Sequence, residues 1–558
     1  MKDKLSIIKD SGIYLLLILT ITLVITSILF ILNISITKFS LIISIILSSI
    51  ILFFIQKDKK KFIKTIILSL IVLTASTLIS TYTFDRSSDG NTYHKDAIGN
   101  LYLGWNPVYE SSEKFVDNNL KIDNYDMHDY DIWKEHYAKA NWILQANFYK
   151  LTDNIESGKA INFIFMYILF TISFTYFYSK IGVKSMILAL IITFNPIACN
   201  QLYTFYNDQL GTSLLFILII SLLKIVDKKD LDNIKLKFLY LFLTFIIITN
   251  IKFNIMGYGL VFTFIFMLYY LYQKYKDKEF LKTFKKLFIL YLIVFTISFG
   301  IVGYSTYIKN FIDHGNPFFP VYGENSEDII TAQQPKDFVN KNVLEKLFIG
   351  TFSKVNNLQD SKEYSLKIPF TFTLDEFKQS MAIDTRLSGF GVFSSGLFIL
   401  SIITLIIYLK KSNEKDEKVN ILILLGINLL LVLIISESWW PRYNPNNYLL
   451  IIILTYLLLK YCNKKIINLL IISLITFNSL IILLGNTYYS FKESYKIHND
   501  FNKLKDKEIN ISFSLGNMTG IIYNLNDFNI NYNINDKDKE NLTYYKYLNY
   551  EEVTNEKE

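Results

Sequence analysis

The sequence is poor in charge, glycine, proline and cysteine. Charged residues make up 19% of the 558 positions, whereas soluble domains carry about a quarter. The 21 glycines and 8 prolines exclude a collagen-like or low-complexity chain. The 2 cysteines, Cys199 and Cys462, belong to different apolar segments, so we expect no disulfide. Together these deficits exclude a single soluble fold.

The apolar residues are abundant, at 51% of the chain, and they gather into long runs. The run 13–33 is long enough, at about 1.5 Å per residue, to cross a hydrocarbon core roughly 30 Å thick. Backbone polar groups in lipid need internal partners, and the ten-residue alternation of a membrane barrel is missing. The sequence therefore predicts an all-α polytopic membrane protein.

The apolar runs predict about 13 transmembrane helices. Because no small-residue cleavage site follows the first run, we expect it to remain as an uncleaved first helix. The predicted spans are 12–33, 40–56, 65–83, 160–179, 185–201, 210–226, 236–250, 255–273, 286–305, 390–409, 419–435, 446–460 and 465–485.

Lysine is distributed unevenly between the two sides of these spans. If the N-terminus is cytoplasmic, the inside loops hold lysine clusters, such as those at 57–64, 224–237 and 274–286, whereas the short outside loops hold only Lys38, Lys252 and Arg442. The positive-inside rule therefore predicts a cytoplasmic N-terminus. The formal net charge of +8 reflects this topology, and we expect no nucleic-acid partner.

Three hydrophilic segments then lie outside: 84–159, 306–389 and 486–558. The first two are too long to be simple connectors in a helical bundle, which favours a functional role. The third contains short alternating runs around Gly516 and Gly520 that predict a few strands. We therefore predict a transmembrane domain over 1–485 with two large extracytoplasmic loops, followed by a small α/β or β external segment over 486–558.

Arginine is scarce: only Arg86, Arg386 and Arg442 occur, all on the predicted outer face. Its planar guanidinium can hold phosphate or carboxylate with two hydrogen bonds, which a lysine cannot do. Each arginine could instead tie down a loop carboxylate. Arg442 is the strongest candidate for a ligand, since it occupies a short outer turn among Trp439, Trp440 and Tyr443.

Acidic residues directly follow the third span. Asp85, Asp89, Tyr93 and His94 begin the first outer loop, and a carboxylate at a membrane surface can remove a proton from a bound hydroxyl. Asp89 could also serve as the N-cap of a surface helix. The segment 135–162 interleaves aromatic and polar residues, which predicts a helix lying in the membrane interface.

Asp208 and Lys252 lie in two short outer turns, where Lys252 suits an anionic head group. The sequence gives only a weak indication of a metal site. Asp126, His128, Asp129 and Asp131 could ligate a cation, although such a cluster is more often a solvated acidic loop. No cofactor is implied, and a bound divalent cation remains open.

Four short motifs give the chain a family resemblance. Asp89 before Tyr93-His94, HGNPFFPVYG at 314–323, DTRLSGFGVF at 384–393 and PRYNPNNYLL from Pro441 occur in the order found in the GT-C superfamily. The chain resembles the bacterial members of that group, which are related to protein mannosyltransferases and aminoarabinose transferases.

This resemblance implies an inverting membrane glycosyltransferase of the bacterial cytoplasmic membrane that builds or decorates the cell envelope. It implies a polyprenyl-phosphate sugar donor, a glycan, lipid or protein acceptor, and a base from the first outer loop. Asp89 matches the position of that base, with Asp85 and Asp208 as neighbouring acids. Arg442-Tyr443 matches the late Arg-Tyr pair that meets the donor phosphate, and Arg386, Lys252, Tyr93 and His94 are further binding candidates.

Two other functions remain open. An O-antigen-type polymerase or ligase would also use external arginines, acting on lipid-diphosphate sugars. A transporter or flippase of lipid-linked saccharides would need ionisable residues deep within its spans, and the predicted spans are nearly free of charge.

Overall fold

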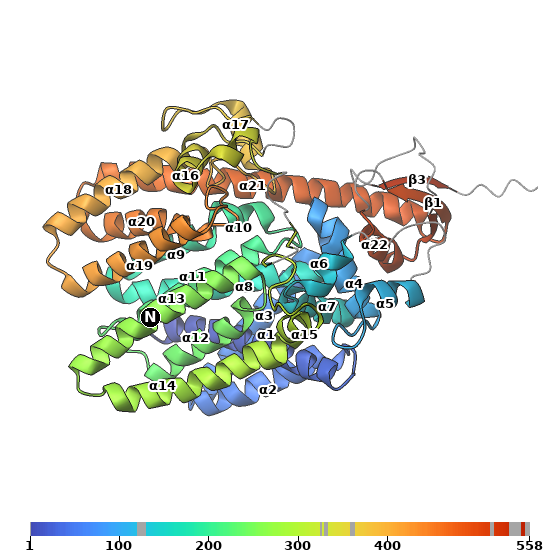
Figure 1. Ribbon diagram of the computed structural model, residues 1–558, viewed down its shortest axis with the longest axis horizontal. Helices are drawn as coiled ribbons and strands as arrows, with labels where there is room; N and C mark the ends of the chain where they lie inside the picture. Colours follow the sequence, from blue (N-terminus) through green and yellow to red (C-terminus); the bar gives the residue numbers. More distant parts are fainter. Residues whose placement is uncertain are drawn as a thin grey trace, which may run out of the picture.

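The computed structural model describes residues 2–119, 130–323, 326–327, 333–357, 363–513, 518–534 and 548–552. In this part of the chain, 9 helical segments are long and apolar enough to cross a membrane. The predicted all-α, multi-pass class is thereby confirmed (Figure 1). The segments contain α1 (Lys2–Ile31), α3 (Lys59–Tyr82), α8 (Ala160–Ile181) with α9 (Ser185–Thr193), α11 (Asp208–Val226), α13 (Phe253–Lys276), α14 (Phe280–Phe295), α18 (Ser394–Lys411), α19 (Lys415–Ile434) and α21 (Lys465–Leu504).

The remaining predicted spans also fall on helices, but on shorter ones. They are α2 (Phe39–Ile55), α12 (Ile234–Ile248), α20 (Leu449–Tyr461), and α9 with α10 (Pro196–Gln201). The break between α9 and α10 follows from the sequence. Asn195 accepts a hydrogen bond from the backbone N–H of Ala198 at 3.1 Å, and Pro196 occupies the first helical position, where its missing N–H costs nothing.

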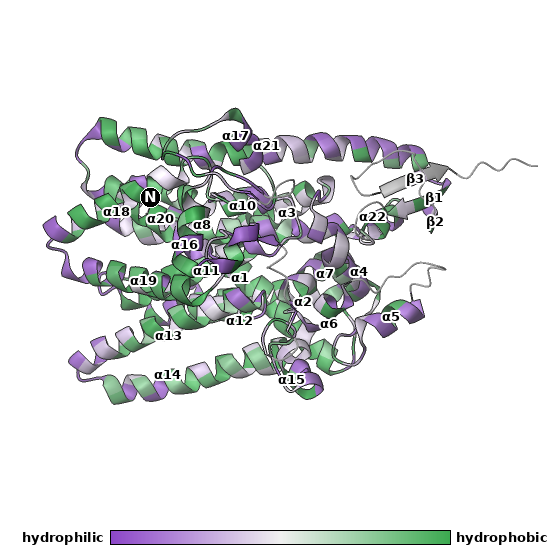
Figure 2. Cartoon of the chain, turned by 45° about the horizontal axis from the view of Figure 1, so that its top comes forward, coloured by the Kyte–Doolittle hydropathy of each residue, from purple (hydrophilic) through white to green (hydrophobic). Residues whose placement is uncertain are grey.

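The helices form an inner and an outer set. Every residue of α11 is buried, and α8 and α20 are buried over most of their length. The outer helices α2, α14, α18 and α19 expose large apolar side chains such as Phe54, Phe288 and Leu429. Figure 2 shows these helices as predominantly hydrophobic along their length. Such a surface fits contact with lipid, because lipid tails replace the water that would otherwise disfavour it.

The lysine-rich loops come together at one end of the bundle. Lys9 pairs with Asp232 at 2.6 Å and Lys229 with Glu414 at 3.0 Å, which joins loops far apart in the sequence. The turns between α13 and α14 and between α18 and α19 lie at the same edge in Figure 1. The loops predicted to share one side of the membrane therefore do share one end of the fold.

The first outer loop folds into short helices rather than an interfacial one. They are η1 (Gly90–His94), α4 (Lys95–Leu103), α5 (Ser112–Asn119), α6 (Asp131–His136), α7 (Ala140–Thr152) and η2 (Ile155–Lys159). The predicted helix in the membrane interface is wrong: Ala140 to Tyr149 of α7 are all buried within the protein. Apolar residues occur on every face of α7, and α1, α4 and η2 pack around it.

The C-terminal segment is joined to the bundle more closely than predicted. Helix α21 has 40 residues and runs without interruption past the predicted boundary between 485 and 486. Beyond it, β1 (Glu508–Phe513) pairs in parallel with β2 (Asn531–Ile534) and antiparallel with β3 (Leu548–Glu552), and α22 (Ile521–Asp527) connects β1 to β2. The segment is α/β, one of the two predicted forms.

Helix α22 packs on the first outer loop through buried polar contacts. The Lys95 ammonium donates to Asn91 at 2.8 Å, to Glu156 at 2.7 Å and to Asn524 of α22 at 2.7 Å. The Asn524 amide in turn donates to Glu156 at 3.0 Å. Gly99 makes the close approach possible, since a Cβ there would lie 2.1 Å from the Tyr523 ring. The C-terminal segment therefore holds the start of the outer loop in place.

We predict that Asn524→Leu lowers the stability of the fold. The substitution leaves the buried Lys95 and Glu156 each without one hydrogen-bond partner, which typically costs about 1.5–3 kcal/mol for charged groups. Thermal unfolding of the purified protein in detergent measures the change. The control is Asn531→Leu at an exposed position of β2, which should unfold at the wild-type temperature. Equal unfolding temperatures for both variants would contradict the role of Asn524.

Candidate functional site

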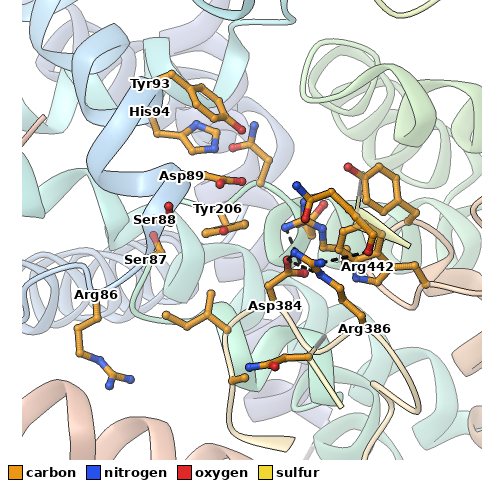
Figure 3. A pocket seen from close by; sticks show the side chains of 18 of the residues that line it. Arg86, Ser87, Ser88, Asp89, Tyr93, His94, Tyr206, Asp384, Arg386 and Arg442 are labelled. Atoms are coloured by element: carbon orange, nitrogen blue, oxygen red, sulfur yellow. Dashed lines mark hydrogen bonds and ion pairs between the residues drawn. The ribbon is translucent and has the colours of Figure 1, made fainter. Parts of the chain in front are cut away.

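A cavity of about 880 Å³ opens at the end of the bundle opposite the lysine-rich loops. Figure 3 shows the side chains that line it from close by. Its position follows from α11, whose first residue, Asp208, lines the cavity and whose last turn lies among the lysines. Its walls come from the loop after α3, from Trp133 and Tyr137, from the turn before α11, from segments 381–386 and 440–443, and from α21. Ligand sites of such size are ordinary for small molecules and head groups.

The cavity gathers nearly all of the residues singled out in the sequence. It is lined by Asp89, Tyr93, His94, Asp208, Lys252, Arg386, Arg442 and Tyr443, and also by Arg86, so that all three arginines of the chain meet here. These residues are separated by up to about 350 positions in the sequence. Asp85 is the one predicted site residue that does not line the cavity.

Arg442 is enclosed by aromatic rings and acids. Its guanidinium carbon lies 4.7 Å from the centre of the Trp440 ring, 5.2 Å from that of Tyr443 and 5.3 Å from that of Tyr206. Stacking of this kind favours a guanidinium over an ammonium.

The charge of Arg442 is balanced by two carboxylates. Its Nη1 lies 3.4 Å from Asp384 and 3.8 Å from Asp208, and both contacts are ion pairs without a hydrogen bond. The Nε and Nη1 atoms are buried and form no hydrogen bond with any described residue. Arg442 therefore keeps unused donors, which an anionic ligand in the cavity could accept.

The two other cations beside Arg442 are each paired. Arg386 donates to Asp384 at 3.3 Å, and its guanidinium carbon lies 4.9 Å from the Trp440 ring centre. The Lys252 ammonium donates to Asp208 at 2.7 Å and lies 4.3 Å from the Tyr443 ring centre. The result is an alternating cluster of cations, acids and aromatic rings on one wall of the cavity.

The segment that carries Asp384 and Arg386 is fixed by backbone hydrogen bonds. The Leu387 N–H donates to the Asn356 carbonyl at 2.8 Å, and the Ser388 N–H donates to the Gly350 carbonyl at 2.8 Å. Gly350 lies in the last turn of α16 (Val343–Phe352). The second outer loop thus delivers its acid and arginine on a rigid support, as binding geometry requires.

Asp89 lies across the cavity from Arg386 and Arg442 (Figure 3). It precedes η1, but its carboxylate makes no N-cap hydrogen bond, so capping does not explain it. Burial raises the pKa of the Asp89 carboxyl above its usual range, Arg442 opposes this rise, and a hydrogen bond from Tyr206 opposes it further. A carboxylate with a raised pKa is a better proton acceptor than an ordinary aspartate.

His94 is a neutral hydrogen-bonding group in this site. The Trp142 indole N–H donates to its Nδ1 at 2.8 Å, which places the ring proton on Nε2. Burial lowers the pKa of His94 to about 3. His94 therefore stays uncharged near neutral pH and can donate one hydrogen bond.

Asp85 has a structural role instead. Both of its oxygens are occupied, because Oδ1 accepts the Ser87 N–H at 2.7 Å and Oδ2 accepts the Phe205 N–H at 2.8 Å. Its side chain is buried, and its own N–H donates to Glu156 at 3.1 Å. Asp85 joins the start of the outer loop to the turn before α11.

Arg86 also has partners outside the central cluster. It donates to Asn486 at 3.3 Å and lies 3.6 Å from Glu493, both on α21, and Figure 3 shows it pointing away from Arg442. Of the metal candidates, Asp126, His128 and Asp129 lie outside the described residues, and Asp131 pairs with Lys134 at 2.7 Å. The described residues contain no group of three or more side chains arranged to bind a metal ion.

Neither the protein-family models nor the curated proteins contain a match to this sequence. Of the four short motifs, those at Asp89, at 384–393 and at Pro441 contribute residues to the cavity, whereas HGNPFFPVYG at 314–323 does not line it.

Sequence reasoning missed Asp384 and Tyr206. Asp384 begins the motif DTRLSGFGVF, but only Arg386 of that segment was singled out as a site residue. Tyr206 belongs to an aromatic turn, TFYND, whose ring directions cannot be read from residue types. The scarcity of arginine was the signal that found the site, since every arginine lines the cavity.

Replacing Asp85 and replacing Asp89 by asparagine should have different effects on the unfolding temperature. We predict that Asp85→Asn lowers the unfolding temperature, because a nitrogen replaces one of two oxygens that accept backbone N–H groups. Asp89→Asn should keep or raise it near neutral pH. Burial raises the folded-state pKa of both acids, so the loss of a buried charge favours folding in both variants near neutral pH. In Asp85→Asn the lost acceptor of a backbone N–H outweighs this gain, whereas the Asp89 carboxylate caps no backbone N–H.

Thermal unfolding of both variants at pH 7 checks this contrast. The contrast between the two acids would be refuted by an Asp89→Asn protein less stable than Asp85→Asn.

Proposed function

We propose that the protein is an inverting membrane glycosyltransferase that takes a sugar from a polyprenyl-phosphate donor. The observation that carries the proposal is the cavity itself, in which a carboxylate with a raised pKa faces a buried arginine with unused donors. The likeness of Asp89-Tyr93-His94 and Arg442-Tyr443 to GT-C motifs supports the same conclusion. The acceptor is a hydroxyl of a cell-surface glycan, lipid or protein.

The reaction assigns one role to each wall of the cavity. The Asp89 carboxylate takes the proton of the acceptor hydroxyl as its oxygen attacks the anomeric carbon. The bond between that carbon and the phosphate oxygen breaks, and its electron pair leaves with the lipid phosphate. Arg442, supported by Lys252 and Arg386, stabilises the negative charge that grows on the leaving group.

The charge balance of the cavity favours a monophosphate donor. The lining holds four cations, Arg86, Lys252, Arg386 and Arg442, and four acids, Asp89, Asp208, Asp384 and Glu493. A phosphodiester adds one negative charge to this balanced set, whereas a diphosphate adds more. This difference supports the polyprenyl-phosphate donor over the lipid-diphosphate of an O-antigen-type polymerase or ligase.

The membrane orientation forms part of the proposal. We place the N-terminus and the lysine-rich loops in the cytoplasm and the cavity on the outer face of a bacterial cytoplasmic membrane, with 13 spans. The positive-inside rule supports this orientation, and the gathering of the lysine-rich loops at one end is consistent with it. A transport function has less support, because the described ionisable groups of the cavity lie at one end of the bundle rather than along a path through it.

Asp89→Asn should abolish transfer of a radiolabelled sugar from a polyprenyl-phosphate donor and leave donor binding near wild type. The amide cannot accept the hydroxyl proton, and loss of a general base typically costs about 10²–10⁴-fold in rate. Wild-type turnover of this variant would rule out Asp89 as the base. The control is Asp58→Asn, which alters an exposed aspartate at the lysine-rich end.

The pH dependence of transfer should follow Asp89. Since its pKa is raised, activity should fall on acidification at a pH above about 3.9, the ordinary aspartate value. His94→Gln should lower the rate but leave this acidic limb in place, because His94 is already neutral there. An acidic limb that disappears in His94→Gln would contradict the assignment.

Arg442→Lys should retain part of the activity, and Arg442→Ala should lose most of it. Removal of one charged contact typically costs about 1.5–3 kcal/mol, on the order of ten- to a hundredfold in affinity or rate. Lysine keeps the charge but not the planar stacking on Trp440. Donor affinity and unfolding temperature, measured on the same samples, separate the roles. An unchanged affinity together with a lowered unfolding temperature would refute the phosphate role.

A further inference from the structure

A second cavity, of about 360 Å³, opens at the lysine-rich end of the bundle. It lies among α8, α11, α19 and α20 and shares no lining residue with the first cavity. Its volume falls within the range of roughly 300–1,000 Å³ typical of ligand sites.

The walls of this cavity change from apolar to polar along each helix. On α19 the lining residues are Asp416, Glu417, Asn420, Ile421 and Leu424, which share one face at spacings of three and four. On α20 the stripe runs from Leu449, Ile452 and Ile453 to Tyr456 and Lys460. On α11 it runs from Phe216, Ile219 and Ile220 to Asp227 just beyond the helix. An apolar interior with a charged mouth matches an amphiphile rather than a polar solute.

The charges at the mouth leave a surplus of acceptors. Lys180 pairs with Asp227 at 2.6 Å, Lys229 pairs with Glu414 at 3.0 Å, and Lys460 contacts Glu417. Asp416 is exposed, and its charge interacts with Lys229, which already pairs with Glu414. One helical turn further in, the buried Oδ1 of Asn420 accepts no hydrogen bond from the described part of the chain. At the point where α19 enters the bundle, the mouth therefore presents the Asp416 carboxylate and an amide oxygen that accepts no hydrogen bond from the described residues.

From this arrangement we infer that the second cavity binds a membrane lipid with a primary ammonium head group, of the phosphatidylethanolamine class. One acyl chain occupies the apolar part between α11, α19 and α20. The ammonium donates hydrogen bonds to Asp416 and Asn420, and the lipid phosphate lies near Lys229. A lipid is the appropriate occupant because α11 and α19 are both membrane-length helices, and their polar ends lie where head groups do.

The test uses the full-length protein in nanodiscs with equal amounts of phosphatidylethanolamine, phosphatidylcholine and phosphatidylglycerol. After release in mild detergent, native mass spectrometry counts the lipids that remain bound. We expect one phosphatidylethanolamine, retained about fivefold over the other two, which corresponds to one exposed charge contact of about 1 kcal/mol. Phosphatidylcholine lacks ammonium N–H donors, and phosphatidylglycerol lacks the positive charge.

Two variants locate the site. Leu424→Trp fills the apolar part and should abolish retention, whereas Leu422→Trp, at a lipid-exposed position of the same helix, should retain the lipid. Asp416→Asn, at an exposed position of α19, should reduce the preference for phosphatidylethanolamine to the level of phosphatidylcholine. Equal retention in the two tryptophan variants, or an unchanged preference in Asp416→Asn, would overturn the inference.

Discussion

The outer cavity depends on the enclosure of Arg442. A buried guanidinium is costly unless acids and aromatic rings replace its water, and here Asp208, Asp384 and the rings of Trp440, Tyr443 and Tyr206 do so. These partners come from separate parts of the chain, so the charge of one residue brings the parts together. The ion pairs involve no hydrogen bond from Nη1 of Arg442, and this leaves donors for a ligand.

The position of Asp89 depends on a second set of contacts. Asp85 and Lys95 fix the residues on either side of it, and Lys95 connects the loop to Glu156 and to Asn524 near the C-terminus. The general base proposed here is therefore held by structural charges that never touch the cavity. Most of the ionisable residues in this loop therefore hold its structure, and only a few of them face the cavity.

Much of this architecture could be predicted from the sequence, because apolar runs and lysine clusters follow directly from the physics of the bilayer. Scarcity of arginine identified three residues that do share one cavity. Asp85 and Asp89 could not be separated, since two acids four residues apart differ only in which backbone groups they meet. The packing of α22 on α4 could not be predicted from the sequence either. It joins Asn524 to Lys95, and no local sequence pattern indicates this contact.

We propose that the Arg442 cluster binds the phosphate of a polyprenyl-linked donor beside Asp89. The decisive measurement is a cryo-electron microscopy structure of the protein in nanodiscs with a polyprenyl phosphate. We expect density for the phosphate within hydrogen-bond distance of Arg442, with open space between the phosphate and Asp89 for a sugar. A phosphate bound outside this cavity, or a cavity that stays empty at saturating lipid, would contradict it.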